Sequence, residues 1–281
     1  MKNSTLKQRI SLAVLAAVMT SGLALPALAS GGMVKIKGSD TMLPLASAWA
    51  ESYMKKNPYA TISVTGGGSG VGLAALINGT CDIADASRAI KPKELTQARD
   101  RNIVPKVTAV AKDGVAVIVN PGNPIKGLSM SDLGKLYTSA QNWKAVGGDN
   151  MKVVAIGRDS SSGTYVFFQD TVLKGKQFRP ETLTLPSNNA ICQTVSQDEG
   201  AIGYVGLAFA KEFAAKHKVR IIAVKGVIAS DETVANGKYP LWRYLYCYTN
   251  GKPGGVAGDY LKFVTGPEGQ KIVVNVGYVA L

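Results

Sequence analysis

Residues 33–53 read MVKIKGSDTMLPLASAWAESY, and this stretch decides the class of fold. Apolar and polar residues alternate over 33–37, which is typical of a short strand with one buried face. Glycine, serine, aspartate and threonine follow at 38–41, and residues of this kind begin helices. From Leu45 to Tyr53 the apolar side chains recur at helical spacing. The stretch therefore predicts a strand, a loop of small polar residues and a helix.

The same pattern of strand, loop and helix recurs along the chain. A strand at 61–65 runs into the glycine loop 66–70 and a second helix, and a third strand is centred on Ile83. Later segments of the same kind are the helices near 131–137 and 164–173, the strand 152–156, a turn with a short strand at 198–205, and the helical segments 256–264 and 269–276. Alternating strands and helices predict an α/β protein with a mostly parallel sheet.

Two longer apolar strands interrupt this alternation, GVAVIV at 114–119 and LWRYLYCYT at 241–249. They bracket a middle block, so we expect the chain to cross into a second lobe near residue 113 and to return near residue 243. The expected boundaries are 30–112 and 244–281 for lobe 1, and 113–243 for lobe 2.

The first thirty residues have the composition of an export signal. Three basic residues precede an apolar run at 10–19, and small residues follow up to Ala29. The run is about ten residues long, whereas a membrane span needs about twenty. We therefore expect residues 1–29 to be a cleaved signal peptide and the mature protein to be periplasmic. No cysteine follows the cleavage site, so no lipid anchor is indicated.

The chain is strongly basic, with 32 Lys+Arg against 19 Asp+Glu and a net charge of +13. A hydrophobic content of 46% with 18% charged residues argues against a disordered chain. Three of the cations lie in the signal peptide, and the others are dispersed without a basic stripe, so a nucleic-acid surface is not supported. We interpret the charge as a mildly positive field that draws a small anion toward a cleft.

Three loops share one design, in which a strand ends, glycine and hydroxyl residues follow and a helix begins. They are GSDT at 38–41, GGGSG at 66–70 and RDSSSGT at 158–164. The start of a helix presents unpaired N–H groups and the positive end of the dipole, so anions bind there. Arg88 and Arg158, at strand ends, add charge and a bidentate fork for an oxyanion. Each loop alone is compatible with a plain helix cap, but together they predict an anion site.

Catalytic motifs fit less well. The glycine loop matches neither the dinucleotide-binding nor the P-loop pattern. Ser69 does not lie in a nucleophile elbow, because Val71 stands where that motif has glycine. His217 is the only histidine, which leaves little for a Ser-His-Asp triad or a histidine-rich metal site. We therefore expect no enzyme activity, no metal and no cofactor.

The three cysteines, Cys81, Cys192 and Cys247, form an odd set without metal-ligand spacing. Each lies among apolar or small residues, which favours a buried position. One disulfide with one free thiol and three buried reduced thiols are both open.

Six short motifs follow one another along almost the whole mature chain. They are KIKGSDTM at 35–42, GGGSG at 66–70, DIADASR at 82–88, GR with SSGT at 157–164, GAIGY at 200–204 and GPEGQK at 266–271. This ordered set resembles the PstS family of periplasmic phosphate-binding proteins. The resemblance implies the type II periplasmic-binding-protein fold, with two α/β lobes joined by two crossover strands and the ligand in the cleft. It also implies inorganic phosphate and an inner-membrane ABC permease as partners, for a protein that we expect to be a monomer.

The resemblance further implies a ligand set. Thr41 and the backbone N–H of Met42 would hold one oxygen, and Ser69 would donate from the glycine loop of the same lobe. Arg158 would be the charge partner in the second lobe. The full candidate set is Ser39, Asp40, Thr41, Met42, Ser69, Ser87, Arg88, Arg158, Ser162, Gly163 and Thr164.

The sequence departs from the family at two carboxylates. In the family an aspartate after the third strand accepts a proton from phosphate, which separates phosphate from fully ionised sulfate. Here an ungapped match places Ser87 at that position. Asp40 is our candidate substitute, although an ordinary helix cap explains it equally well, and Asp85 is a further candidate. A second-lobe aspartate that pairs with the arginine is also missing, and Ser160 stands there.

Other functions stay open at this stage. One is a receptor for another tetrahedral oxyanion, such as sulfate, molybdate or arsenate. Another is an exported phosphomonoesterase in which a loop serine attacks phosphate, and a third is a surface interaction protein that merely keeps the fold.

Overall fold

The computed structural model describes residues 32–281, and the predicted signal peptide at 1–29 lies outside the described residues. The strands are β1 Met33–Gly38, β2 Thr61–Thr65, β3 Ile83–Ala86, β4 Pro105–Val119, β5 Gly127–Leu128, β6 Val154–Arg158, β7 Leu183–Leu185, β8 Ala201–Gly206, β9 Arg220–Ile221, β10 Ala223–Val224 and β11 Trp242–Asn250. The helices are α1 Leu43–Lys56, α2 Ser69–Ile77, α3 Pro92–Asp100, α4 Met130–Thr138, η1 Trp143–Val146, α5 Gly163–Thr171, α6 Asn188–Val195, α7 Leu207–Ala215, α8 Asp231–Ala235, α9 Gly255–Thr265 and α10 Pro267–Asn275.

The three predicted units of strand, loop and helix are present as β1–α1, β2–α2 and β6–α5. Several features differ from the sequence prediction. Helices α3, α6 and α8 and strand β7 were not anticipated, and β4 begins at Pro105 rather than near residue 114. The early part of β4 contains exposed and half-exposed residues, so it has no continuous apolar run to reveal it.

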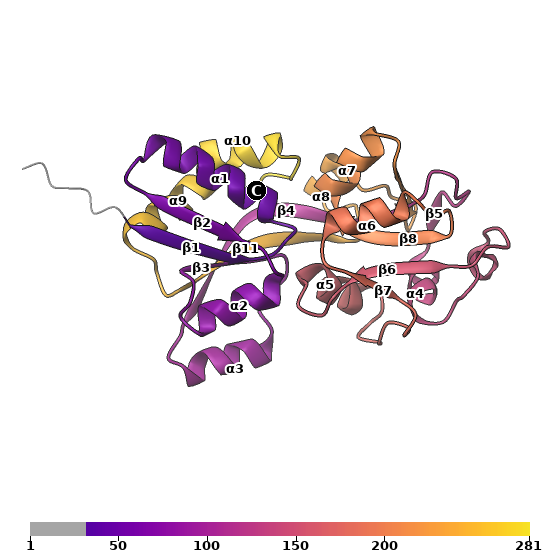
Figure 1. Cartoon of the computed structure of the whole chain (residues 1–281), viewed down its shortest axis with the longest axis horizontal. Helices are drawn as coiled ribbons and strands as arrows, with labels where there is room; N and C mark the ends of the chain where they lie inside the picture. Colours follow the sequence, from indigo (N-terminus) through magenta and orange to yellow (C-terminus); the bar gives the residue numbers. More distant parts are fainter. Residues whose placement is uncertain (1–31) are drawn as a thin grey trace, which may run out of the picture. The chain divides into compact units, whose positions relative to one another are not determined.

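The sheet is mixed rather than mostly parallel. β1 pairs in parallel with β2 and β3, and β6 pairs in parallel with β7 and β8, as expected for strands linked by helices. The two crossover strands, β4 and β11, are antiparallel to each other and lie side by side in the middle of the sheet (Figure 1). They join the two parallel parts into one sheet of order β2-β1-β3-β11-β4-β8-β6-β7. The prediction of a mostly parallel sheet therefore holds only for the strands at each end of the sheet.

Each of the two crossover strands contributes residues to two different apolar clusters. One cluster includes Ala111 on β4 and Leu245 on β11, together with Trp49 and Tyr260. The other begins at Val115 on β4 and at Leu241, just before β11, and includes Trp143 and Phe168. The described chain thus has two lobes, each with its own core, joined by two strands. The lobe boundaries at residues 113 and 243 stay predictions.

Helices cover both faces of the first lobe's strands. In Figure 1, α1, α9 and α10 lie on one side of β1–β3, and α2 and α3 lie on the other. Trp49 Nε1 donates to the carbonyl oxygen of Gly269 at 2.8 Å, which ties α1 to α10. This contact holds α1 against α10. Helices α1 and α2 directly follow β1 and β2 in the chain, so they begin near the carboxyl ends of those strands.

Three further properties follow from the described residues. Between residues 32 and 281 the structure contains no helix with the length and apolar character needed to cross a membrane. Within the same range no group of three or more His, Cys, Asp or Glu side chains could hold a metal ion. Cys81, Cys192 and Cys247 are all buried free thiols, so the structure has the second of the two arrangements left open.

Candidate anion-binding site

Three helices begin where the two lobes meet. Thr41 lies just before α1, Ser69 is the first residue of α2, and Thr164 is the second residue of α5. The Oγ1 atoms of Thr41 and Thr164 are 3.0 Å apart, although they come from different lobes. None of the three helices has an acidic residue in its first turn. The positive ends of the helix dipoles are therefore not neutralised by the first turns of the helices themselves, as suits an anion site.

A cluster of buried serine hydroxyls lies beside these helix starts. Ser39 Oγ is 3.0 Å from Ser87 Oγ, and Ser69 Oγ is 3.3 Å from Ser87 Oγ. Ser87 also donates its backbone N–H to Ser69 Oγ at 3.0 Å. Gly163 of the second lobe packs against this cluster, because a Cβ there would lie closer than 3.0 Å to the hydroxyls of both Ser69 and Ser87. The start of α5 can thus approach the serines of the first lobe only because residue 163 is glycine.

Arg158, at the end of β6, is 3% exposed and forms an ion pair with Asp40 of the other lobe. The second oxygen of Asp40 accepts the N–H of Gly67 at 2.9 Å. Both carboxylate oxygens are therefore engaged. These contacts support Asp40 as the partner of the arginine, the position for which the sequence offered Ser160. Its role as acceptor of a ligand proton stays a prediction.

The glycine loop also contacts the second lobe directly. Gly70 N–H donates to Ser161 O at 2.8 Å, and Ser161 Oγ donates to Gly67 O at 3.2 Å. Gly68 has a φ of 100°, and a Cβ there would lie 2.6 Å from Ser161 Oγ. Glycine is thus required both by the backbone conformation and by the close approach of the two loops.

Two of the predicted ligand residues make hydrogen bonds within the starts of the helices. Ser162 caps α5, since its Oγ accepts the N–H groups of Thr164 at 3.2 Å and Tyr165 at 3.4 Å. Met42 is fully buried, and its N–H donates to Ser39 O at 3.0 Å. Direct contacts of these residues with an anion stay predictions.

Arg88 lies beside the glycine loop but is paired elsewhere. Its Nη1 and Nη2 donate to both carboxylate oxygens of Glu94 at 2.8 and 2.7 Å. Burial opposes ionisation of Glu94, but the hydrogen bonds from Arg88 and Lys91 outweigh it and lower the pKa of Glu94. The guanidinium of Arg88 is therefore held in place by a carboxylate, and its role as a ligand stays a prediction.

Sequence reasoning missed two buried charges on the crossover strands. Arg243 Nε and Nη2 donate to Asp113 Oδ2 at 3.1 and 2.8 Å. Nη2 also donates to Thr164 Oγ1 at 3.0 Å, so the ion pair adjoins the site. A signal was present, because Arg243 is the only charged residue in the apolar run 241–249 and Asp113 immediately precedes the run 114–119.

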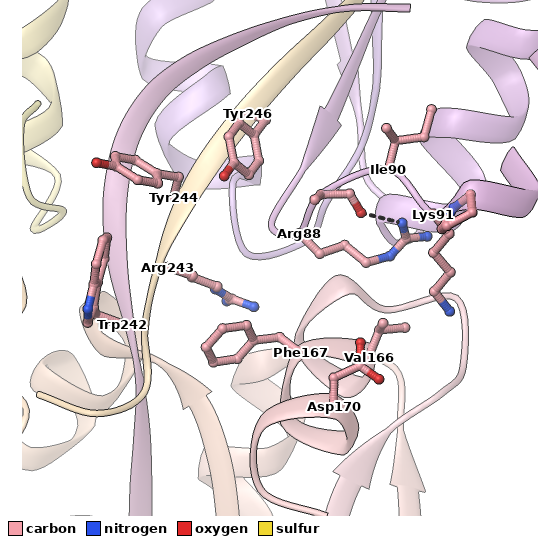
Figure 2. A pocket seen from close by; sticks show the side chains of 12 residues that line it. Arg88, Ile90, Lys91, Val166, Phe167, Asp170, Trp242, Arg243, Tyr244 and Tyr246 are labelled. Atoms are coloured by element: carbon pink, nitrogen blue, oxygen red, sulfur yellow. Dashed lines mark hydrogen bonds between the residues drawn. The ribbon is translucent and has the colours of Figure 1, made fainter. Parts of the chain in front are cut away.

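A cavity of ≈ 470 Å³ opens beside the site, between the two lobes (Figure 2). Figure 2 shows Arg243 reaching from β11 over the ring of Phe167, while Arg88 approaches from the first lobe. The guanidinium carbon of Arg243 is 5.5 Å from the centroid of the Phe167 ring. Tyr244 and Tyr246 of β11 also line this cavity. Solvent thus reaches the border of the site next to two arginines.

Asp85, the further acceptor candidate, is a buried carboxyl in β3. Its Oδ1 accepts a hydrogen bond from the thiol of Cys247, with Sγ at 3.1 Å. Burial raises the pKa of Asp85 to about 7, although the hydrogen bond from Cys247 opposes the shift. Its side chain makes this contact inside the first lobe rather than with the helix starts.

We predict that the Asp85→Asn variant is more stable than the wild type at pH 8, by about 1–3 kcal/mol. An unfolded aspartate releases its proton near pH 4, whereas the folded group keeps it to about pH 7. The wild type therefore loses stability as the pH rises through this window, and the uncharged variant does not. Urea unfolding at pH 5 and pH 8 measures the difference, with the exposed Asp100→Asn as control. An equal pH dependence in wild type and Asp85→Asn would contradict the buried, protonated carboxyl.

The fold and the site together place the chain in a class. A family model described as a PBP superfamily domain matches residues 25–268. Two α/β lobes, two crossover strands and helix starts that face each other between the lobes define the type II periplasmic-binding-protein fold, which confirms the expected fold class.

Individual relatives narrow the class to a family. The phosphate-binding protein PstS of Bacillus subtilis is 34% identical over 252 residues, which cover 89% of this chain and 81% of the relative. PstS of Pseudomonas aeruginosa is 34% identical over 274 residues, covering 90% and 84%. A crystal structure from Clostridium perfringens, described as a phosphate ABC transporter substrate-binding protein with bound phosphate, is 29% identical with a TM-score of 0.80, covering 89% of this chain and 100% of that one. The chain belongs to the PstS family of phosphate-binding proteins, as its motifs indicated.

Proposed function

We propose that this protein captures inorganic phosphate between its two lobes and delivers it to an ABC permease of the inner membrane. The observation that carries the proposal is the convergence of Arg158 with the starts of α1, α2 and α5 in one buried site. Relatives named for phosphate binding, one of them solved with bound phosphate, support the choice of ligand.

The chemistry of the site suits a partly protonated tetrahedral anion. Ser39, Ser69, Ser87 and the two threonines each offer a hydroxyl that both donates and accepts. Such groups pair with a bare phosphate oxygen and with a phosphate O–H. Arg158 supplies a charge-assisted donor, and its Nε is buried without a hydrogen-bond partner among residues 32–281. An oxyanion between the lobes would satisfy that group.

For delivery, the permease must distinguish the phosphate-bound protein from the phosphate-free protein. An anion that touches Thr41 in one lobe and Thr164 in the other stabilises only the arrangement in which both are close. The contacts between Gly70 and Ser161 add direct lobe-to-lobe hydrogen bonds in that arrangement. The permease would then recognise the closed protein.

We further propose that the mature chain acts in the periplasm as a monomer, without binding nucleic acid. A binding role without catalysis is supported by the partners of the serines. Ser69 and Ser87 hydrogen-bond each other, and Ser162 accepts two backbone N–H groups, so within residues 32–281 none of these hydroxyls is paired with a carboxylate or an imidazole that would activate it as a nucleophile.

Competition calorimetry at about pH 7 tests the choice of anion. Inorganic phosphate should bind to the mature protein with a 1:1 stoichiometry, and sulfate should bind at least about tenfold more weakly. Arsenate, which is protonated like phosphate, should compete with it. Tighter binding of sulfate or molybdate would assign the site to another oxyanion, and turnover of a chromogenic phosphate ester would favour an esterase.

The Asp40→Asn variant should narrow the preference for phosphate over sulfate by about three- to tenfold. The carboxylate of Asp40 places negative charge beside the anion, which penalises a ligand that has no proton to donate. Asparagine keeps an oxygen for Gly67 N–H but removes that charge. The same competition titration measures the ratio, with Asp132→Asn, a half-exposed aspartate on α4 away from the site, as control. An unchanged ratio would leave Asp40 as a structural partner of Arg158 only.

A further inference from the structure

The two crossover strands carry an ion pair that neither lobe supplies alone. Asp113 on β4 and Arg243 on β11 are directly opposite each other in the antiparallel register. Asp113 and Arg243 are 2% and 5% exposed. Asp113 Oδ2 accepts both Nε and Nη2 of Arg243, and Oδ1 accepts the N–H of Leu207 at 3.2 Å. The guanidinium is therefore fixed from one side, with its remaining edge turned away from Asp113.

The guanidinium also adjoins the helix starts, through the same Nη2 that binds Asp113. Arg243 Nη2 donates to Thr164 Oγ1 at 3.0 Å and lies 3.5 Å from Thr41 Oγ1. These are the two threonines that bring α5 and α1 together. Arg243 thus contacts a hydroxyl from each lobe at the point where the proposed anion would sit.

One donor of Arg243 is unused. Its Nη1 is buried and has no hydrogen-bond partner among residues 32–281. Buried N–H groups in native proteins are almost always paired, and one that is left unpaired destabilises the structure. Within the described part of the chain, the guanidinium of Arg243 thus has one unpaired donor, Nη1, while its Nη2 contacts two hydroxyls. An oxyanion can accept from a guanidinium and from hydroxyls together, so this is a place for such a ligand.

We propose that Arg243 is a further cationic ligand of the anion, supplied by the crossover strand, and that Asp113 is its positioning residue. This inference rests on the proposed function. Because Arg243 belongs to the connection between the lobes, it holds the anion at the base of the cleft while Arg158 holds it from the second lobe. The pair with Asp113 orients the guanidinium and offsets its charge in the empty site.

The test is calorimetry with inorganic phosphate on the full mature chain and four variants. Arg243→Lys and Arg243→Gln should weaken binding by at least about 30-fold, and Asp113→Asn by about tenfold. Arg179→Lys is the matched control, since Arg179 is a buried arginine of the second lobe whose Nη2 donates to Val153 O and whose Nη1 donates to Ala140 O. It should change the affinity by less than about twofold. Folded Arg243 variants that bind like the wild type would overturn the inference.

A second measurement, made on the wild type, tests the inference even if the variants fail to fold. In the wild type, the assigned guanidinium NMR signals of Arg243 should shift on titration with inorganic phosphate, and those of Arg179 should not. Unchanged Arg243 signals at saturation would overturn the inference while leaving the proposed function intact. If the wild type binds no phosphate in calorimetry, the proposed function fails and the inference fails with it.

Discussion

The Arg158→Ala variant should bind phosphate at least about 100-fold more weakly than the wild type. Arg158 is the buried cation at the start of the second lobe's loop, and its charge-assisted hydrogen bonds would be made to the anion without competition from water. The substitution also leaves Asp40 as an unpaired negative charge next to the ligand. Both effects act in the same direction, so this loss is among the largest that we expect.

A double variant separates the two effects. Arg158→Ala with Asp40→Asn removes the unpaired carboxylate, so it should recover part of the affinity and most of any lost stability. Calorimetry gives the affinities, and thermal unfolding without phosphate shows that each variant is folded. A folded Arg158→Ala protein that binds phosphate within about threefold of the wild type would remove Arg158 from the site.

The Gly163→Ala variant should also lose at least about 100-fold in affinity, for a steric reason. A Cβ at residue 163 would collide with the hydroxyls of Ser69 and Ser87 on the other lobe. Gly163 opens α5 and has no positive φ, so its backbone accepts alanine without strain. The fold of each lobe should survive, but the two lobes could no longer approach each other.

Small-angle scattering with and without saturating phosphate measures this loss of closure, together with calorimetry. Gly134→Ala is the matched control, because it also lies in a helix and its Cβ would meet only Val172 O, at 3.5 Å. The control should bind phosphate like the wild type. Closure and tight binding by Gly163→Ala would show that the lobes do not meet through this contact.

Local sequence was sufficient to predict the parts of the site that are local. Each of the loops 38–41, 66–70 and 158–164 joins a strand to a helix, and each combines glycine with hydroxyl residues. Helix starts of this type follow from the identities of adjacent residues. The three loops together predicted one anion site, but its place in a cleft between two lobes was expected only from the resemblance of the ordered motifs to a known family.

Contacts between residues far apart in the sequence could not be predicted from local sequence patterns. Arg158 pairs with Asp40, which lies 118 residues away in the sequence, and Arg243 pairs with Asp113, which lies 130 residues away. The second pair depends on the register of β4 against β11, which includes a bulge between Leu245 and Tyr246. No local spacing encodes that register. For the same reason the antiparallel middle of the sheet was missed, although the strands that form it were recognised.

A crystal structure of the mature protein with inorganic phosphate would show where the anion binds. We predict one phosphate between the lobes, within hydrogen-bond distance of Arg158 and of the hydroxyls of Thr41, Ser69 and Thr164. A protein that crystallises at saturating phosphate with no anion at these helix starts, or with its ordered phosphate elsewhere, would contradict this site and the function proposed for it.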